Sequence, residues 1–446
     1  MLLDITRTVT LYLLPPLTLV LGVGLAELSA GQDRIMGANE AVALTAAAVG
    51  PLIAVVVLGA LNQGFDHTLV ATGGMLTSIG TATLFSLSWA QNANAAFYQS
   101  IVTRHSFFVC GGFLALVAGA LLSHHLDRIR GFPFTLLVVA LLLTLVTMTF
   151  GETVNGARLW LRAGPVQFQP SEVARLFLVG FVAIYLYDRR HLVVAPWRVA
   201  ALDLPPAPYL APLVGAILAA VAVLALQNDL GMAALVVLGA YALVAAVLSS
   251  RWALGLAGAT LAVTAIASHA ISARVRERVA AWLEPWYDPA GRGYQFVQAE
   301  FAMASGGILG EAAVNSPARV PEVHTDFILV AIATEWGWVG AAAVLTLIGI
   351  IVCRSLAAAL RAADGFRSLL ALGVAALLGI QALLICGGTL RIVPLTGVTL
   401  PLVSYGGTSM IVTLFALGVV AGIGASEAVR PVKTHGASFR PDRSQD

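Results

Sequence analysis

The sequence is short of charge and almost free of lysine. Charged residues make up 11% of the 446 residues and hydrophobic residues 59%, whereas a soluble domain carries about 25% charged residues. So little polar surface cannot cover a water-soluble globule, and we therefore expect an integral membrane protein. Lys433 is the single lysine among 25 basic residues. Because no basic run is interleaved with aromatic residues, a nucleic-acid partner is excluded.

Cysteine is also scarce. Cys110, Cys353 and Cys386 lie in or beside apolar runs, and none belongs to a CxxC or Cys/His cluster. Their odd number and surroundings argue against a disulfide framework or a zinc site. The N-terminus lacks the ordered basic, apolar and small-residue segments of a signal peptide, so we expect its first apolar run to be a retained helix.

Long apolar runs dominate the chain, and a bilayer crossing needs roughly 20 such residues. This pattern predicts an all-α polytopic membrane protein with about twelve transmembrane helices. The expected spans are 8–28, 40–61, 67–88, 105–123, 132–150, 171–187, 208–226, 229–249, 252–270, 326–352, 368–388 and 405–424.

The basic residues indicate the orientation of these spans. With the N-terminus in the cytoplasm, fourteen basic residues fall inside and five fall in short outside segments. Arginine and lysine favour the cytoplasmic side, so both termini are predicted to be cytoplasmic. Residues 1–150 then form an N-terminal helical region and 151–424 the membrane core. The polar tail 425–446 is expected to be disordered.

The predicted outer loop 271–325 is too long for a simple connection. It is rich in aromatic residues, so we expect it to be folded rather than disordered. Arg274, Arg278, Trp282 and Trp286 recur every four residues, which places them on one helical face. Such a face is typical of a membrane anchor, and the alternative is that its arginines attract a pyrophosphate.

Two carboxylates and an imidazole lie within five residues of the segment Pro321–Phe327. Asp326 is the candidate general base, with Glu322, His324 and Thr325 in support. The alternative is that Thr325 or Asp326 only caps the next helix. That alternative accounts for one acid but leaves Glu322 and His324 unexplained. Glu335, deeper in the same run, is interpreted as a structural polar contact.

Four further segments present polar side chains at predicted outer ends of spans. Each has a structural alternative, such as a helix cap or the i, i+3 ion pair between Glu172 and Arg175. The candidate substrate-binding residues are Asn155, Arg158, Gln169, Ser171, Glu172, Gln227, Asp229, Tyr294, Gln295, Gln298, Ser404, Tyr405, Gly406, Gly407 and Ser409.

Taken in order, these segments resemble the SEDS family, the shape, elongation, division and sporulation proteins that include RodA and FtsW. The matching stretches are NGARLW–FQPSE (155–172), QNDLG (227–231), GRGYQFVQ…SGG (291–307), PEVHTDF (321–327) and PLTGVTLPLVSYGGTS (394–409). The most specific are PEVHTDF and LPLVSYGG.

The resemblance implies a peptidoglycan glycosyltransferase that polymerises lipid II, an undecaprenyl-linked substrate, at the outer face of the cytoplasmic membrane. It implies a class B penicillin-binding protein as partner, a ten-helix core preceded here by about two extra helices, and Asp326 as the catalytic aspartate. Replacing an α-linked pyrophosphate by a β-1,4 bond requires inversion, hence one displacement and one base. No metal-ligand spacing is visible, so arginines and a divalent cation stay open as alternatives for stabilising the leaving group.

The chain departs from the family pattern at several positions. Leu159 replaces an arginine, so Arg158 is expected to supply that charge, and Asn228 replaces a proline. Thr396 replaces the lysine of the FtsW form, which favours the RodA type and a role in elongation rather than division. Two other functions stay open. They are a lipid II flippase and a noncatalytic scaffold for a penicillin-binding protein.

Overall fold

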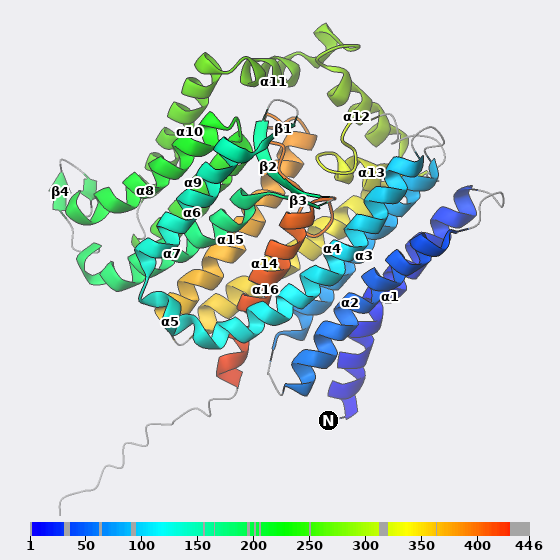
Figure 1. Ribbon diagram of the computed structural model, residues 1–446, viewed down its shortest axis with the longest axis horizontal. Coiled ribbons are helices and arrows are strands. Elements are labelled where there is room, and N and C mark those ends of the chain that lie inside the picture. The colour runs from blue at the N-terminus through cyan, green and yellow to red at the C-terminus, as the bar shows by residue number, and fades with distance from the viewer. Residues whose placement is uncertain are drawn as a thin grey trace, which may run out of the picture.

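The computed structural model describes residues 2–30, 36–61, 65–90, 95–154, 157–164, 166–193, 197–199, 202–204, 207–248, 251–311, 320–362 and 364–428. Its α-helices are α1 (Leu2–Ala30), α2 (Ala38–Ala60), α3 (His67–Ala90), α4 (Ala95–Leu122), α5 (Leu126–Arg130), α6 (Pro133–Phe150), α7 (Pro170–Val193), α8 (Ala207–Leu226), α9 (Leu230–Leu248), α10 (Arg251–Ile271), α11 (Ala273–Leu283), α12 (Tyr294–Ser305), α13 (Ile328–Glu335), α14 (Gly337–Arg361), α15 (Gly365–Thr389) and α16 (Gly407–Ala428). Figure 1 shows most of them running side by side, with α11 and α12 at one end of the bundle.

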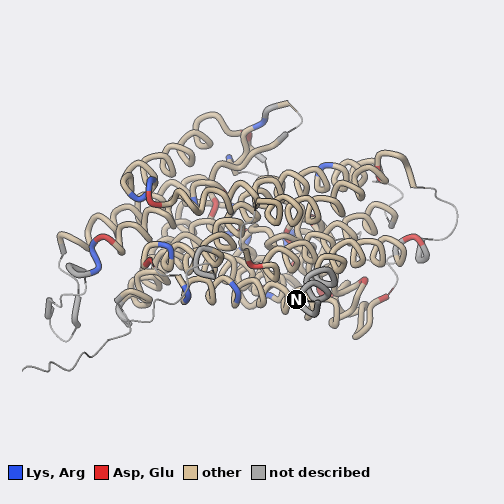
Figure 2. Tube along the Cα trace, turned by 90° about the horizontal axis from the view of Figure 1, so that it is seen from below, with Lys and Arg blue, Asp and Glu red and all other residues tan. Residues whose placement is uncertain are grey.

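The predicted polytopic membrane fold is confirmed. Over the described residues, eleven helices are long and apolar enough to cross a membrane. The predicted count of twelve is not confirmed. In α1, the apolar segment whose side chains are described is Tyr12–Leu25, which is shorter than a membrane-spanning helix. Charged residues are sparse along the trace, as Figure 2 shows.

The predicted tenth span, 326–352, is wrong at its start. The chain forms a turn over 321–327, then the short buried helix α13, and the spanning helix α14 begins only at Gly337. Gly337 has φ +69°, and an added Cβ would lie 2.1 Å from the Ile308 carbonyl oxygen. The helix breaks there because the backbone takes a left-handed conformation against the loop after α12.

Short strands form two small antiparallel sheets, which the sequence did not predict. Strands β1 (Glu152–Val154), β2 (Ala157–Ala163) and β3 (Val166–Phe168) make one sheet between α6 and α7. Strands β4 (Trp197–Val199) and β5 (Leu202–Leu204) pair between α7 and α8. Two 3-10 turns, η1 (Ser123–His125) and η2 (Pro285–Tyr287), complete the described elements.

The centre of the bundle is built on close contact between α4 and α16. An added Cβ at Gly119 would lie 2.2 Å from the Phe415 carbonyl oxygen, and one at Gly418 would lie 1.9 Å from that of Leu116. Small residues allow this approach, which is how membrane helices pack without a hydrophobic driving force. The pairing fixes where the start of α4 and the loop before α16 meet.

Candidate active site

A cavity of about 700 Å³ opens among the connecting segments at the end of the bundle that carries α11 and α12. Its walls come from α4, the β1–β3 sheet, the α8–α9 turn, α11, the start of α12, the 321–327 turn and the 395–407 loop. Eleven residues proposed from the sequence line it: Asp326, Glu322, His324, Thr325, Gln169, Glu172, Asp229, Gln295, Tyr405, Gly406 and Gly407.

The 321–327 turn is built around one carbonyl group. The Glu322 oxygen accepts hydrogen bonds from the amides of Thr325, Asp326 and Phe327 at 3.1, 3.1 and 3.3 Å. Glu322 itself has φ +54°, a conformation that costs a non-glycine residue energy and is often found at functional sites. The turn therefore holds the Asp326 backbone in one position at the cavity wall.

This turn is tied to the 400–405 segment, so the two most specific sequence motifs form one structural unit. The Tyr405 amide donates to the His324 carbonyl oxygen at 2.9 Å. The Ser404 hydroxyl donates to the Thr325 carbonyl oxygen at 2.7 Å and accepts from the Leu400 amide at 2.9 Å. Ser404 is thus a structural link between the motifs and does not line the cavity.

The Asp326 carboxyl is buried, and both acidic and basic side chains act on its pKa. Burial raises its pKa to about 6, and the nearby Glu322 carboxylate acts in the same direction. Arg278, a hydrogen bond from Thr325, and Arg274 oppose that shift by stabilising the charged form. A carboxylate with this pKa is deprotonated at neutral pH and still basic enough to accept a proton in a transition state.

Helix α11 brings Arg274 and Arg278 to the cavity wall, one turn apart. The Arg274 pKa is lowered by burial and by Arg278, and one of its terminal nitrogens has no hydrogen-bond partner among the described residues. The prediction that Trp286 shares this face is wrong, because α11 ends at Leu283 before Pro285. Trp282 instead donates to the Arg391 carbonyl oxygen at 3.0 Å.

Asp229 is a second acid in the cavity wall. Its Oδ1 accepts from the Met232 amide at 3.1 Å, which is the helix cap that the structural alternative predicted. Its Oδ2 has no hydrogen-bond partner among the described residues, and burial raises the Asp229 pKa to about 6. Close behind it, an added Cβ at Gly231 would lie 2.4 Å from the Thr396 carbonyl oxygen.

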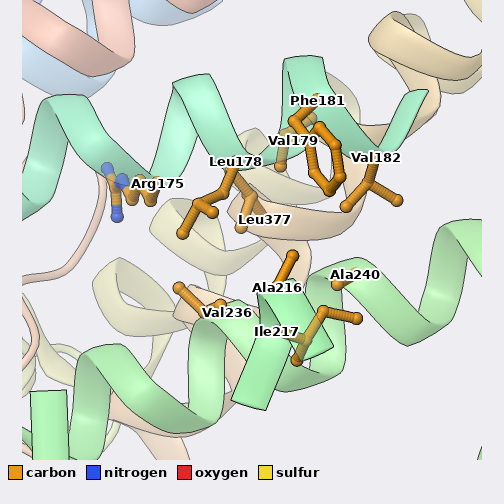
Figure 3. Close-up of a pocket in the computed structure, with 10 residues that line it drawn as sticks. All are labelled: Arg175, Leu178, Val179, Phe181, Val182, Ala216, Ile217, Val236, Ala240 and Leu377. Carbon is orange, nitrogen blue, oxygen red and sulfur yellow. The ribbon is translucent and has the colours of Figure 1, made fainter. Parts of the chain in front are cut away.

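The predicted Glu172–Arg175 ion pair is present and buried, with 2.7 Å between its atoms. Arg175 also donates to Gln381 at 2.8 Å, and Gln381 donates to the Thr399 carbonyl oxygen at 2.7 Å. Arg175 therefore ties α7 to α15 and to the loop that lines the cavity. It also borders a second cavity among α7, α8, α9 and α15, shown in Figure 3. That space, about 10 Å³ and otherwise lined by apolar side chains, holds about one water molecule and no sugar.

Several residues proposed for substrate binding do not reach the cavity. Arg158 points to the exposed Thr153 hydroxyl at 3.1 Å, while Leu159 and Trp160 of the same strand face the cavity. The expectation that Arg158 replaces the charge missing at Leu159 is therefore not supported, because Arg158 bonds to Thr153 and is not among the residues that line the cavity. Asn155 lies outside the described residues.

The other proposed substrate-binding residues that do not line the cavity have structural partners or lie beyond its edge. Gln227 is buried and donates to Thr147 at 3.0 Å, Ser171 accepts from Gln169 at 3.1 Å, and Ser409 pairs with Thr399 at 3.1 Å. On α12 only the first turn reaches the cavity. There Gln295 donates to the Pro321 carbonyl oxygen at 3.0 Å, whereas Tyr294 and Gln298 do not line the cavity.

One cavity residue on α4 was not predicted from the sequence. Arg104 lines the cavity and hydrogen-bonds the Tyr405 hydroxyl, whose pKa burial raises. The rings of Tyr98 and Tyr405 each lie 5.9 Å from that of His324. Burial lowers the pKa of His324 and therefore favours its neutral form. In the sequence, the only indication of this cavity residue was its place as a basic residue near the start of an apolar run.

The described residues contain no group of three or more His, Cys, Asp or Glu side chains placed to hold a metal ion. Among the described residues, the positive charges that act on the pKa of Asp326 are those of Arg278 and Arg274. These two arginines are therefore the candidates for holding a phosphate group in the cavity.

Comparisons with known proteins identify relatives of the chain. A family model described as "Cell cycle protein", FTSW_RODA_SPOVE, matches residues 66–428, so α1 and α2 precede the match. Peptidoglycan glycosyltransferase RodA of Mycobacterium tuberculosis is 37% identical over 290 residues, which are 64% of this chain and 61% of that protein. The chain thus spans less than two thirds of that relative. A probable peptidoglycan glycosyltransferase FtsW of Geobacter metallireducens is 32% identical over 369 residues, 81% of this chain and 95% of that protein.

Two solved structures share the fold. Rod shape determining protein RodA of Thermus thermophilus has a TM-score of 0.58 at 28% identity, covering 81% of this chain and 97% of that one. A chain from a study of how a peptidoglycan synthase complex coordinates polymerization and crosslinking has a TM-score of 0.65 at 32% identity. The match covers 82% of this chain and 99% of that one.

Proposed function

The chain belongs to the FtsW, RodA and SpoVE family of cell cycle proteins, and from this membership and its cavity we propose that it is a peptidoglycan glycosyltransferase. Its substrate is lipid II, a disaccharide on an undecaprenyl pyrophosphate. The reaction joins these disaccharides into glycan strands at the outer face of the membrane. The observation that carries the proposal is the Asp326 carboxyl, whose pKa is raised to about 6 in a cavity that also holds Arg274 and Arg278.

Asp326 is the general base of this reaction. Its carboxylate takes the proton from the acceptor's sugar 4-hydroxyl while that oxygen bonds to C1 of the donor sugar. The C1–O bond to the pyrophosphate breaks at the same time, and undecaprenyl pyrophosphate leaves with the electron pair. One displacement with one base inverts the configuration at C1.

Arg274 and Arg278 stabilise the leaving pyrophosphate. Both line the cavity that contains Asp326. One terminal nitrogen of Arg274 has no hydrogen-bond partner among the described residues. Fixed cations aimed at developing negative charge lower the barrier because they need no reorganisation during the step. Asp229 interacts electrostatically with both arginines and serves here as a positioning residue.

The experiment is to supply purified protein in proteoliposomes with labelled lipid II. We expect glycan polymer, since the cavity contains a base and cations for the leaving group. Translocation of lipid II without polymer would favour a flippase, and neither product would favour a scaffold. A companion variant, Arg278→Gln, should slow polymerisation more than Arg276→Gln, because Arg276 is exposed and is not among the residues lining the cavity.

We also propose that a class B penicillin-binding protein accompanies the chain and cross-links its product. The likeness to a chain from a peptidoglycan synthase complex supports this partner. Both termini are proposed to be cytoplasmic, in line with the distribution of basic residues. The RodA-type role in elongation is proposed from Thr396 and the extra N-terminal helices, which lie before the family match.

A further inference from the structure

A further polar cavity, of about 540 Å³, lies between the starts of α2 and α4, beside the cavity that contains Asp326. Its size is within the range of about 300–1,000 Å³ typical of small-molecule sites. One wall is the N-terminal turn of α2, Gly37–Glu40, and the other is one face of α4. Helix α2 precedes the family match, which begins at residue 66, so half of this cavity is built by a part of the chain outside that match.

The α4 wall is continuous along the helix. Ala96, Gln99, Ser100 and Thr103 follow the i, i+3, i+4, i+7 spacing of one helical face. Arg104 ends this wall and also lines the reaction cavity, where it hydrogen-bonds the Tyr405 hydroxyl. The two cavities therefore share a wall residue, which places this cavity beside the one that contains Asp326.

The lining indicates the chemistry of its ligand. Asn39 and Gln99 provide amides, Ser100 and Thr103 provide hydroxyls, and the remaining small residues leave the backbone accessible. None of the described residues that line it has a large aliphatic or aromatic side chain, which disfavours a lipid chain. The lining contains one acidic residue, Glu40, and one basic residue, Arg104, so it has no excess of positive charge that would favour a polyanion.

We propose that this cavity is an accessory carbohydrate site that holds the neutral sugar backbone of the glycan strand next to the bond being formed. Amides and hydroxyls can each donate and accept, which suits sugar hydroxyl and acetamido groups. The site lies toward α2 and α4, whereas the pyrophosphate-binding arginines are on α11. Figure 1 shows α1, α2 and α3 at one side of the molecule and α8, α9 and α10 at the other. This inference rests on the proposed function, because it names a second subsite for the same product.

The site should govern how long the strand grows before release. A strand held at a second subsite dissociates more slowly between additions, because two contacts must break together. Ser100→Trp fills the cavity from the middle of the α4 wall. Leu114→Trp is the matched control, since Leu114 is on the same helix, is exposed and lines neither cavity.

The test measures strand length from lipid II and binding of a soluble tetrasaccharide of β-1,4-linked N-acetylglucosamine, both on the full-length protein in detergent or liposomes. Ser100→Trp should shorten the mean strand at least threefold and weaken tetrasaccharide binding at least fivefold, while Leu114→Trp matches wild type. Gln99→Ala, which removes an amide without adding volume, should weaken binding in the same direction. If Ser100→Trp does not fold, Gln99→Ala still tests whether this cavity binds the tetrasaccharide.

Strands of wild-type length together with unchanged tetrasaccharide binding in Ser100→Trp and Gln99→Ala would overturn the site. That result would leave the polymerase proposal intact. Conversely, if wild type makes no polymer but only the cavity variants lose tetrasaccharide binding, the site stands and the proposed reaction fails.

Discussion

At the scale of single residues, two acids in the cavity have similar pKa values but differ in how they bond to the backbone. Burial raises the pKa of both Asp326 and Asp229 to about 6. Asp229 uses one oxygen to cap α9 through the Met232 amide. Asp326 has no backbone cap of this kind, because its turn is closed by the Glu322 carbonyl group instead. Asp229 therefore has a helix-capping role that Asp326 does not share, and Asp326 is the proposed base.

The raised pKa of Asp326 also predicts how stability depends on pH. The folded-state pKa of about 6 lies above the unfolded value of 3.8, so the carboxyl stabilises the fold fully only below pH 3.8. That contribution is lost as pH rises through 6. Asp326→Asn removes the buried charge, so its melting temperature should exceed that of wild type at pH 7.5 and match it near pH 4.

The measurement is thermal denaturation of both proteins in the same detergent across this pH range. A difference between wild type and Asp326→Asn that is constant from pH 4 to 7.5 would contradict the assigned pKa shift.

At the scale of elements, the site depends on loops held together by close backbone contacts. Gly231 at the start of α9 lies against the Thr396 carbonyl oxygen, and an added Cβ would approach it to 2.4 Å. This contact sets the position of the 395–399 segment in the cavity wall. A methyl group there must push the segment away, since backbone cannot move aside as a flexible side chain can.

Gly231→Ala should therefore destabilise the protein by about 1–3 kcal/mol through overpacking and slow polymerisation at least tenfold. Gly255→Ala in α10 is the matched control, because no atom lies within 4 Å of its added Cβ. Alanine is the better helix former, so the control should be neutral or slightly stabilising. Chemical denaturation and the lipid II assay check both variants. Equal behaviour of the two would show that the close contact has no role in shaping the site.

The sequence predicted the elements whose signal is local. Spans such as α9 and α15 follow from uninterrupted apolar runs, and their bounds lie within a few residues of those expected. The break before α14 could not be predicted, because residues on both sides of Gly337 are apolar. Its cause is a backbone contact with Ile308, about thirty residues earlier in the chain. The β1–β3 sheet was missed since its strands are only three to seven residues long.

The site was predictable to the extent that its residues lie in polar motifs between spans. Asp326, Asp229 and Gln295 all reach the cavity. Arg104 was not found, because its place depends on how α4 packs against α16 through glycines distant in sequence. Arg158 does not line the cavity, and the reason was hidden in the sequence because its partner Thr153 is set by the pairing of β1 with β2, which was not predicted.

At the scale of the whole molecule, the proposed reaction requires the cavity to face outward. The basic-residue bias predicts that 271–325 is outside and both termini are inside. In a variant whose three native cysteines are replaced by serine, single cysteines at Ala290 and Ala428 provide the test. An impermeant thiol reagent should label position 290 in intact cells and position 428 only after lysis. Labelling of 428 but not 290 in intact cells would reverse the orientation.

The proposed reaction depends most on Asp326 as a base, and the direct measurement is polymerisation of lipid II by Asp326→Asn. Asparagine keeps the size and caps a helix about as well as aspartate, but it cannot accept the proton. We predict a folded variant whose rate falls at least 100-fold, the lower end of what a general base contributes. Glu322→Gln should be milder, since the Glu322 carbonyl that closes the turn remains. Polymerisation by Asp326→Asn within a few-fold of the wild-type rate would contradict the assignment.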